Sequence, residues 1–284
     1  MTKLRKLFVA TSAVASVIST SNATAQDWTP AGRTSAAISP LPEKESRAVV
    51  QVLAARTVRW RKYFAVHSWI ATKEKDAKFY RVYQVIGWRL RRGQDVVSIE
   101  TDLPDRKWFG HLPELIYDLR GKKAESAIPK IHAAALSYPY QGAYRAWPGP
   151  NSNTFVSHII RNTPEIGVEL PPTAIGKDWM GKGDLVGLSE SKTGVQFSLF
   201  GLLGMTVGLG EGVEMNVLGL SFGVDVLRPA IKLPLIGRLG FSDASLDQDE
   251  DSPETATAKD PISPEKLMEN PEKKSSDDRP VSLD

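Results

Sequence analysis

The chain has 284 residues, no cysteine and a formal net charge of +3. Disulfides and thiolate metal sites are therefore excluded, and a covalent nucleophile would have to be an oxygen. The charge is unevenly placed, because residues 242–284 hold thirteen acidic and five basic residues, whereas residues 26–241 carry a net +8. This basic body is either a plain solvated surface or one that favours anionic envelope partners. Nucleic acid is not expected, since the chain has no nucleic-acid motif.

The N-terminus has the three parts of a secretory signal peptide. Three basic residues within the first six positions precede an apolar run over 7–18, and Ala23-Thr24-Ala25 offers a cleavage site before Gln26. We therefore expect a periplasmic or secreted protein. The alternative is an uncleaved membrane anchor, which the short, Ser/Thr-diluted apolar run disfavours.

After an extended lead-in over 26–47, short apolar and β-branched runs predict four strands of an antiparallel meander. They cover residues 49–56, 64–72, 79–88 and 96–101. Helical spacing of apolar residues then predicts helices over 112–119 and 124–136, with Pro129 kinking the second or marking its first turn. Residues 138–147 are expected to be extended, and a helix is expected to begin at Ser152.

The chain changes character after this core domain, which we place at 48–192. Residues 193–241 are dense in glycine and aliphatic residues, and predict a close-packed hairpin or short buried elements. The uncharged run 195–210 is shorter than the roughly 20 residues of a spanning helix. Contact of residues 195–224 with a membrane surface is the alternative. Residues 242–284 predict a disordered acidic tail.

Ser152 and His67 are the candidate catalytic pair. Ser152 follows a Pro-Gly-Pro turn and opens a helix, where free N–H groups favour developing negative charge. His67 lies in an apolar strand with Ala65 and Trp69 on its own face, and could act as a general base. Gln84 is the candidate to orient the imidazole. The structural alternative makes Ser152 a helix cap and His67 a core residue.

Two further side chains could orient His67 in place of Gln84, namely Glu100 and Asp102. Arg145 and the pair Lys177-Asp178 could bind a substrate carboxylate or phosphate, or could form surface ion pairs. No metal site and no cofactor are expected, because the chain lacks an H-E-x-x-H motif and a complete phosphate loop.

Several long strings resemble a bacterial family known as domain of unknown function 3750. The strings are residues 54–57, 64–67, 147–155 and 171–178, and the likeness extends from Ala48 to about Gly240. This resemblance implies a shared fold and no known activity.

A second, more distant resemblance is to permuted papain-like hydrolases of the PPPDE and LRAT-like type. Those proteins carry a strand histidine first and, much later, an Asn-Cys-Asn or Asn-Cys-Glu motif at the start of a helix. Here His67 precedes Asn151-Ser152-Asn153, with serine in place of the thiol. The resemblance implies Ser152 as nucleophile with His67 as its base. Asn151, Asn153 and Trp147 are further candidates for contact with a substrate.

The sequence thus predicts an α+β fold, with an antiparallel sheet of four to six strands and packed helices, a Gly-rich extension and an acidic tail. The expected function is a hydrolase or acyltransferase that acts on an amide or ester in the cell envelope. The alternative is a non-catalytic envelope protein that binds a small molecule, peptide or lipid, or a membrane-associated scaffold.

Overall fold

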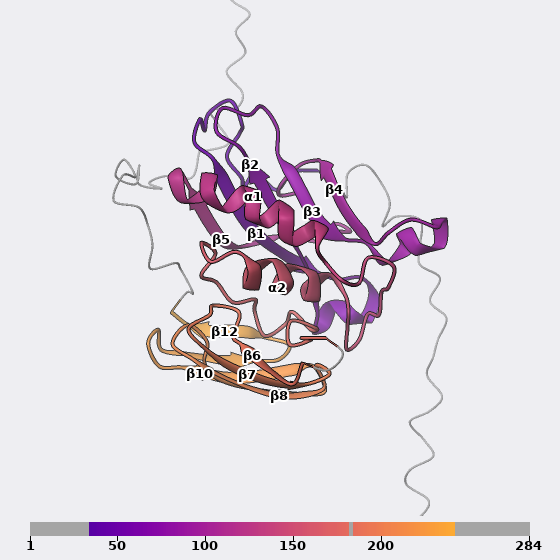
Figure 1. Cartoon of the computed structure of the whole chain (residues 1–284), viewed down its shortest axis with the longest axis vertical. Coiled ribbons are helices and arrows are strands. Elements are labelled where there is room, and N and C mark those ends of the chain that lie inside the picture. Colours follow the sequence, from indigo (N-terminus) through magenta and orange to yellow (C-terminus); the bar gives the residue numbers. More distant parts are fainter. Residues whose placement is uncertain (1–33, 182–183, 242–284) are drawn as a thin grey trace, which may run out of the picture. The chain divides into compact units, whose positions relative to one another are not determined.

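The computed structural model describes residues 34–181 and 184–241. The predicted signal peptide, the first part of the lead-in and the predicted acidic tail lie outside these residues. Within these described residues the fold is α+β, with two antiparallel sheets and two α-helices (Figure 1). The predicted fold class is therefore confirmed.

The first sheet has five strands in the order β4-β3-β2-β1-β5. The strands are β1 (Val49–Arg56), β2 (Val66–Lys73), β3 (Arg81–Val85), β4 (Val97–Thr101) and β5 (Glu114–Arg120). All neighbours are antiparallel, with β1 paired to both β2 and β5. Its central strands β1 and β2 are buried on both faces, which agrees with their nearly continuous apolar sequences.

One face of this sheet is covered by α1 (Lys122–Leu136) and α2 (Ser152–Asn162), as Figure 1 shows. Val52 and Ile70 of the sheet belong to the same core as Ile131 of α1 and Phe155 of α2. A second, smaller core lies on the other face of the sheet and includes Leu53, Trp69 and Trp108, and the loop after β4 closes it. The side chains of β2 thus alternate between two separate cores.

Two short 3-10 helices connect the strands of the first sheet. One, η3 (Arg59–Tyr63), joins β1 to β2, and the other, η4 (Gly87–Arg92), joins β3 to β4. Neither contains a buried residue.

The Gly-rich region forms a second sheet of seven strands, ordered from β12 to β6 as an up-and-down meander. Its strands are β6 (Val186–Leu188), β7 (Gly194–Leu199), β8 (Leu203–Gly208), β9 (Gly212–Val217), β10 (Leu220–Asp225), β11 (Ala230–Leu233) and β12 (Gly237–Gly240). The sequence predicted a close-packed hairpin or short buried elements here, whereas these residues form strands β7 to β12 of this larger sheet, with many exposed apolar side chains.

Two local predictions are wrong. Residues 112–119 were expected to be helical, but residues 114–120 form β5, because Tyr117 and Leu119 point inward on alternate positions and pair with β1. Residues 138–147 form turns in place of the expected extended segment. The predicted helix from Ser152 and the helix over 124–136 are both present, with Pro129 inside α1.

Candidate functional site

The Asn-Ser-Asn motif begins α2, but the helix cap is Asn151 and not Ser152. The Asn151 carboxamide oxygen accepts hydrogen bonds from the backbone N–H groups of Asn153 and Thr154, at 2.9 and 3.2 Å. The Thr154 hydroxyl in turn accepts from the Asn151 N–H at 3.1 Å, which completes a capping box. Ser152 is the first helical residue and is 5% exposed.

The two asparagines also tie the helix to its surroundings. Asn153 Nδ2 donates to the carbonyls of Val66 and Ile175 at 3.0 and 2.8 Å, and its Oδ1 accepts from Ser68 Oγ at 2.8 Å. Asn151 Nδ2 also donates to the Ile175 carbonyl at 2.9 Å. The motif therefore joins β2, α2 and the loop over residues 171–178.

His67 lies on the face of β2 opposite to Ser68. This face contributes to the smaller core, which we call the aromatic core because it contains Trp69 and Trp108. The His67 ring stacks on Trp108 with centroids 3.9 Å apart and planes 14° apart. Its Nε2 lies 3.3 Å from Gln84 Oε1, the side chain expected to orient it. Burial lowers the pKa of His67 to about 3, with Arg106 adding to this and the Gln84 contact opposing it. The imidazole is therefore neutral and a weak base.

The expected pairing of Ser152 with His67 is thus not what the structure shows. Ser68, the neighbour of His67 on the strand, reaches α2 by bonding to Asn153. Successive strand side chains point to opposite faces, so His67 points away from the helix that carries Ser152. Proton transfer requires hydrogen-bond contact, and in the described part of the chain the hydrogen bond of His67 is to Gln84 and not to Ser152.

The other predicted site residues are mainly internal to the protein. Lys177 and Asp178 are 3% and 4% exposed, and both make contacts with the second sheet. Trp147 is half exposed, and its Nε1 donates to the Leu218 carbonyl at 2.9 Å, in the turn between β9 and β10. Arg145 is exposed. Glu100, the alternative partner for His67, pairs instead with Arg89 at 2.9 Å.

Asp178 is the centre of a buried polar joint, the set of contacts between the loop 171–178 and the inner face of the second sheet. Its carboxylate accepts from Gln196 Nε2 at 2.6 Å, from Asn216 Nδ2, and from Ser221 Oγ at 3.3 Å. These three partners come from β7, β9 and β10. A single carboxylate therefore accepts hydrogen bonds from three strands of the second sheet.

Lys177 begins the ionic half of the same joint. Its Nζ lies 2.7 Å from Glu214 of β9, and Glu214 lies 3.0 Å from Lys232 of β11. Burial alone would lower the pKa of Lys177, but the surrounding carboxylates, Glu214 foremost, raise the pKa well above its usual value. The two lysines also hold the pKa of Glu214 below its usual value against the effect of burial.

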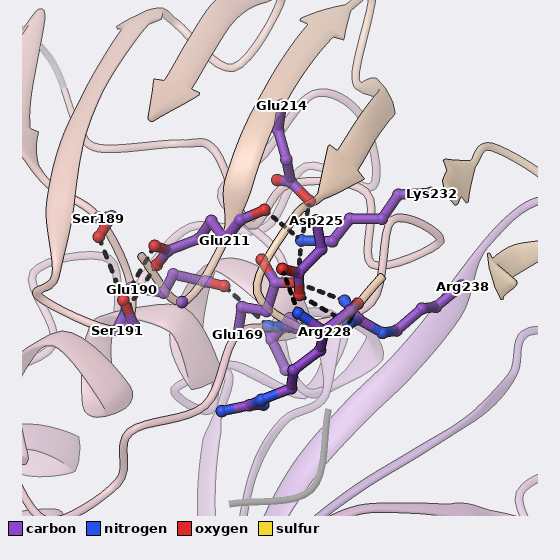
Figure 2. A network of polar contacts seen from close by, with 12 residues as sticks. Glu169, Ser189, Glu190, Ser191, Glu211, Glu214, Asp225, Arg228, Lys232 and Arg238 are labelled. Atoms are coloured by element: carbon purple, nitrogen blue, oxygen red, sulfur yellow. Dashed lines mark hydrogen bonds and ion pairs between the residues drawn. The ribbon is translucent and has the colours of Figure 1, made fainter. Parts of the chain in front are cut away.

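Figure 2 shows how this network continues across the inner face. Lys232 also pairs with Glu169, which precedes the loop 171–178, and donates to the Glu211 carbonyl at 2.7 Å. Arg238 of β12 pairs with Asp225 at 2.6 Å. The inner face of the second sheet is therefore bound to the rest of the protein by ions and hydrogen bonds.

The outer face of the second sheet has the opposite character. Its strands alternate strictly, so that polar or small residues point inward and apolar residues point outward. The outward side chains line up in three rows across the strands: Leu188, Val195, Val207, Val213, Val224, Ile231 and Leu239; Val186, Phe197, Met205, Met215 and Phe222; Leu199, Leu203, Val217 and Leu220. No charged residue occurs in these rows.

The apolar outer face, as we call these three rows, is large for a surface exposed to water. Met205 and Met215 at its centre are 53% and 52% exposed. Summed over the rows, the exposed apolar area is on the order of 1,000 Å², about twice the largest patch of a typical monomer. The alternation over 195–199 and 203–207 could have revealed the sheet from the sequence. The sequence alone does not show which face of this sheet points toward the rest of the protein.

A cavity of about 320 Å³ lies beside α2 and β6. Its walls include Tyr138, Tyr140, His158, Arg161 and Trp179. Among the residues predicted as site residues, none lines this cavity. Across residues 34–181 and 184–241, no three acidic or histidine side chains are grouped to hold a metal ion.

The helices in the described part of the chain are too short or too polar to cross a membrane. The structure thus defines an α+β protein with a buried polar joint and a second sheet that exposes its apolar face. Residues 47–179 match the family described as Protein of unknown function (DUF3750), which supports the family assignment made from the sequence. Searches of curated proteins and of solved structures found no match.

Proposed function

We propose that this chain is a non-catalytic, membrane-associated protein of the cell envelope, which attaches to a lipid surface through its apolar outer face. The single observation that carries the proposal is the inverted polarity of the second sheet. A sheet that buries ions and exposes uncharged apolar rows is unfavourable in water, and contact with an apolar phase removes that penalty.

The turns of the second sheet favour a lipid surface over a second copy of the chain. Leu209, Leu218, Val226, Leu227 and Ile236 lie in these turns and are 59–76% exposed. Two sheets packed face to face would leave such turns at the rim, in water. A lipid phase accommodates the turns together with the face. Export by the predicted signal peptide, cleaved before Gln26, belongs to this proposal and would bring the chain to the periplasmic membrane surfaces.

The hydrolase hypothesis finds less support in the geometry. It requires a base beside Ser152, whereas His67 points into the aromatic core on the other face of the sheet. Asn151 and Asn153, which would flank a substrate, use their side chains in internal hydrogen bonds. The non-catalytic alternative requires none of these groups to be free.

Vesicle co-sedimentation of the mature chain, from Gln26 onward, tests the proposal. A Met205→Ser/Met215→Ser/Phe222→Ser variant removes apolar area from one row while keeping the charge unchanged. We expect binding to phosphatidylcholine vesicles to weaken by at least tenfold, because each buried apolar side chain contributes about 1.5 kcal/mol or more. The melting temperature should stay within a few degrees, since the replaced side chains point away from the protein.

The matched control is Leu41→Ser/Leu112→Ser/Leu136→Ser, which changes side chains of 57–65% exposure outside the second sheet. This control should bind like the wild type. Failure of the wild type to bind any vesicle, or a stable dimer in which the apolar outer face is shielded and vesicle binding is lost, would refute the proposal.

A further inference from the structure

An exposed turn next to the second sheet combines cations with aromatic rings. The helix η3 has the sequence Arg-Trp-Arg-Lys-Tyr, in which Trp60 and Tyr63 are 65% and 67% exposed. Lys62 Nζ lies over the Tyr63 ring, 5.5 Å from its centroid. Among the described residues, no carboxylate forms an ion pair with Arg59, Arg61 or Lys62. Exposed tryptophan and tyrosine are unfavourable in water and typical of interfaces.

The segment before α2 enlarges this surface. Tyr144 is 39% exposed, and Arg61 lies close enough for its charge to affect the tyrosine hydroxyl. Arg145 follows and is also exposed. We call Arg59, Trp60, Arg61, Lys62, Tyr63, Tyr144 and Arg145 together the basic-aromatic patch. It holds four cations and three aromatic rings.

The patch is continuous with the apolar turns of the second sheet. Arg56, three residues before η3, donates to the Leu235 carbonyl at 3.1 Å, in the turn between β11 and β12. Trp147, two residues after Arg145, donates to the Leu218 carbonyl at 2.9 Å. Leu235 and Leu218 are 50% and 59% exposed. The residues that flank the patch in the chain, Arg56 and Trp147, are therefore each hydrogen-bonded to a turn that we place in lipid.

We propose that the basic-aromatic patch binds anionic phospholipid headgroups and so directs the chain to anionic membranes. This inference rests on the proposed function and specifies its lipid class. Tryptophan and tyrosine favour the headgroup region, and cations next to a lipid surface interact with its negative potential. With the apolar turns in the acyl region, the patch would lie at headgroup level, where charge and aromatic rings are both accommodated.

The test compares vesicles of phosphatidylcholine alone with vesicles that contain about one third phosphatidylglycerol. The mature chain, from Gln26 onward, should bind the anionic vesicles at least tenfold more tightly, and added salt should weaken this preference. An R59Q/R61Q/K62Q/R145Q variant should lose most of the preference while its binding to phosphatidylcholine stays unchanged. The control K44Q/K75Q/K78Q/K122Q makes the same change in net charge with lysines away from the patch, and should keep the preference.

The outcomes separate this inference from the proposed function. Equal binding of the wild type to both vesicle types overturns the inference and leaves membrane attachment intact. A preference that survives in the patch variant, or that disappears equally in the control, also overturns it. If the wild type binds neither vesicle, both proposals fail. Equally tight, patch-dependent binding to dextran sulfate without vesicles would assign the patch to soluble polyanions and overturn the lipid assignment.

Discussion

The surroundings of His67 determine its chemistry more than its strand position does. The ring is buried and stacked on Trp108, and its pKa of about 3 lies far below the ordinary 6.5. A histidine that stays neutral in the folded state must be protonated on unfolding below pH 6.5. Its stabilising contribution is therefore complete above that pH and falls as the pH drops toward 3.

We predict that His67→Gln reduces the acid sensitivity of folding. Between pH 7 and pH 5, the wild type should lose about 2 kcal/mol more of its unfolding free energy than the variant, because a depressed pKa contributes about 1.4 kcal/mol per pH unit in this range. Urea denaturation at the two pH values measures this difference. Protonation of the folded-state ring between pH 5 and 7, observed by NMR, would contradict the prediction.

The asparagines and the serine of the Asn-Ser-Asn motif should differ in their effect on stability. Asn153→Ala removes three buried hydrogen bonds and leaves the carbonyls of Val66 and Ile175 without this donor. We expect a loss of about 2–4 kcal/mol. Ser152→Ala keeps the cap on Asn151 and should lose less than about 1 kcal/mol. Fluorophosphonate labelling of wild-type Ser152 that depends on His67 would instead support the hydrolase hypothesis.

At the scale of elements, α2 depends on a loop that is distant in sequence. The loop over 171–178 packs so closely on the cap that Gly176, with φ of +97°, has the Asn151 side chain against it. A Cβ added at Gly176 would lie 2.4 Å from Asn151 Nδ2. The cap of α2 and the conformation of this loop are therefore set together.

We predict that Gly176→Ala destabilises the protein by about 2–4 kcal/mol, through backbone strain and displacement of the helix cap. Gly93→Ala is the matched control, because its φ is +67° but nothing lies within 4 Å of the added Cβ. The control should lose only about 1 kcal/mol. Thermal unfolding of both variants measures these losses of stability. Equal losses in the two variants would show that packing against Asn151 is unimportant.

Several elements could be predicted from the sequence because their signals are local. The strand 49–56 is a continuous apolar and β-branched run, and the helix from Ser152 follows a proline-rich turn. The segment 112–119 was misassigned because Leu112, Leu115 and Leu119 have helical spacing, while its pairing with β1 depends on residues far away in the chain. The position of His67 relative to Ser152 could not be predicted for a similar reason. A strand residue can be assigned to one face by alternation, but only the tertiary structure shows which face meets α2.

On the scale of the whole molecule, the polar joint holds the second sheet in place. Lys177 and Glu214 are both 4% exposed by side chain and lie 2.7 Å apart. Glu214 has a lowered pKa, so its contribution is present above the ordinary carboxyl pKa of 4.5 and is lost as the pH falls below it. The ion pairs of the polar joint should therefore stabilise the folded protein at neutral pH, and this stabilisation should decrease in acid.

We predict that Lys177→Met alone lowers the unfolding free energy by about 3–5 kcal/mol, because it leaves a buried carboxylate short of one partner. Lys177→Met/Glu214→Met should recover most of that loss, since a buried ion pair is often replaceable by apolar residues. Lys130→Met is the control, because it breaks an exposed pair with Glu165 and should change stability by less than about 1 kcal/mol. A double variant no more stable than the single one would argue against this account.

The polar joint also has a thermodynamic consequence. Exposing apolar surface to water raises the heat capacity, whereas exposing polar surface lowers it. Detachment of the second sheet would expose mainly its polar inner face and the loop residues Lys177 and Asp178 that bind it, while its apolar outer face is already accessible. This step should therefore show a heat-capacity change near or below zero. Unfolding of the first sheet, which opens two apolar cores, should show the usual large increase, so calorimetry could resolve the two sheets as separate transitions.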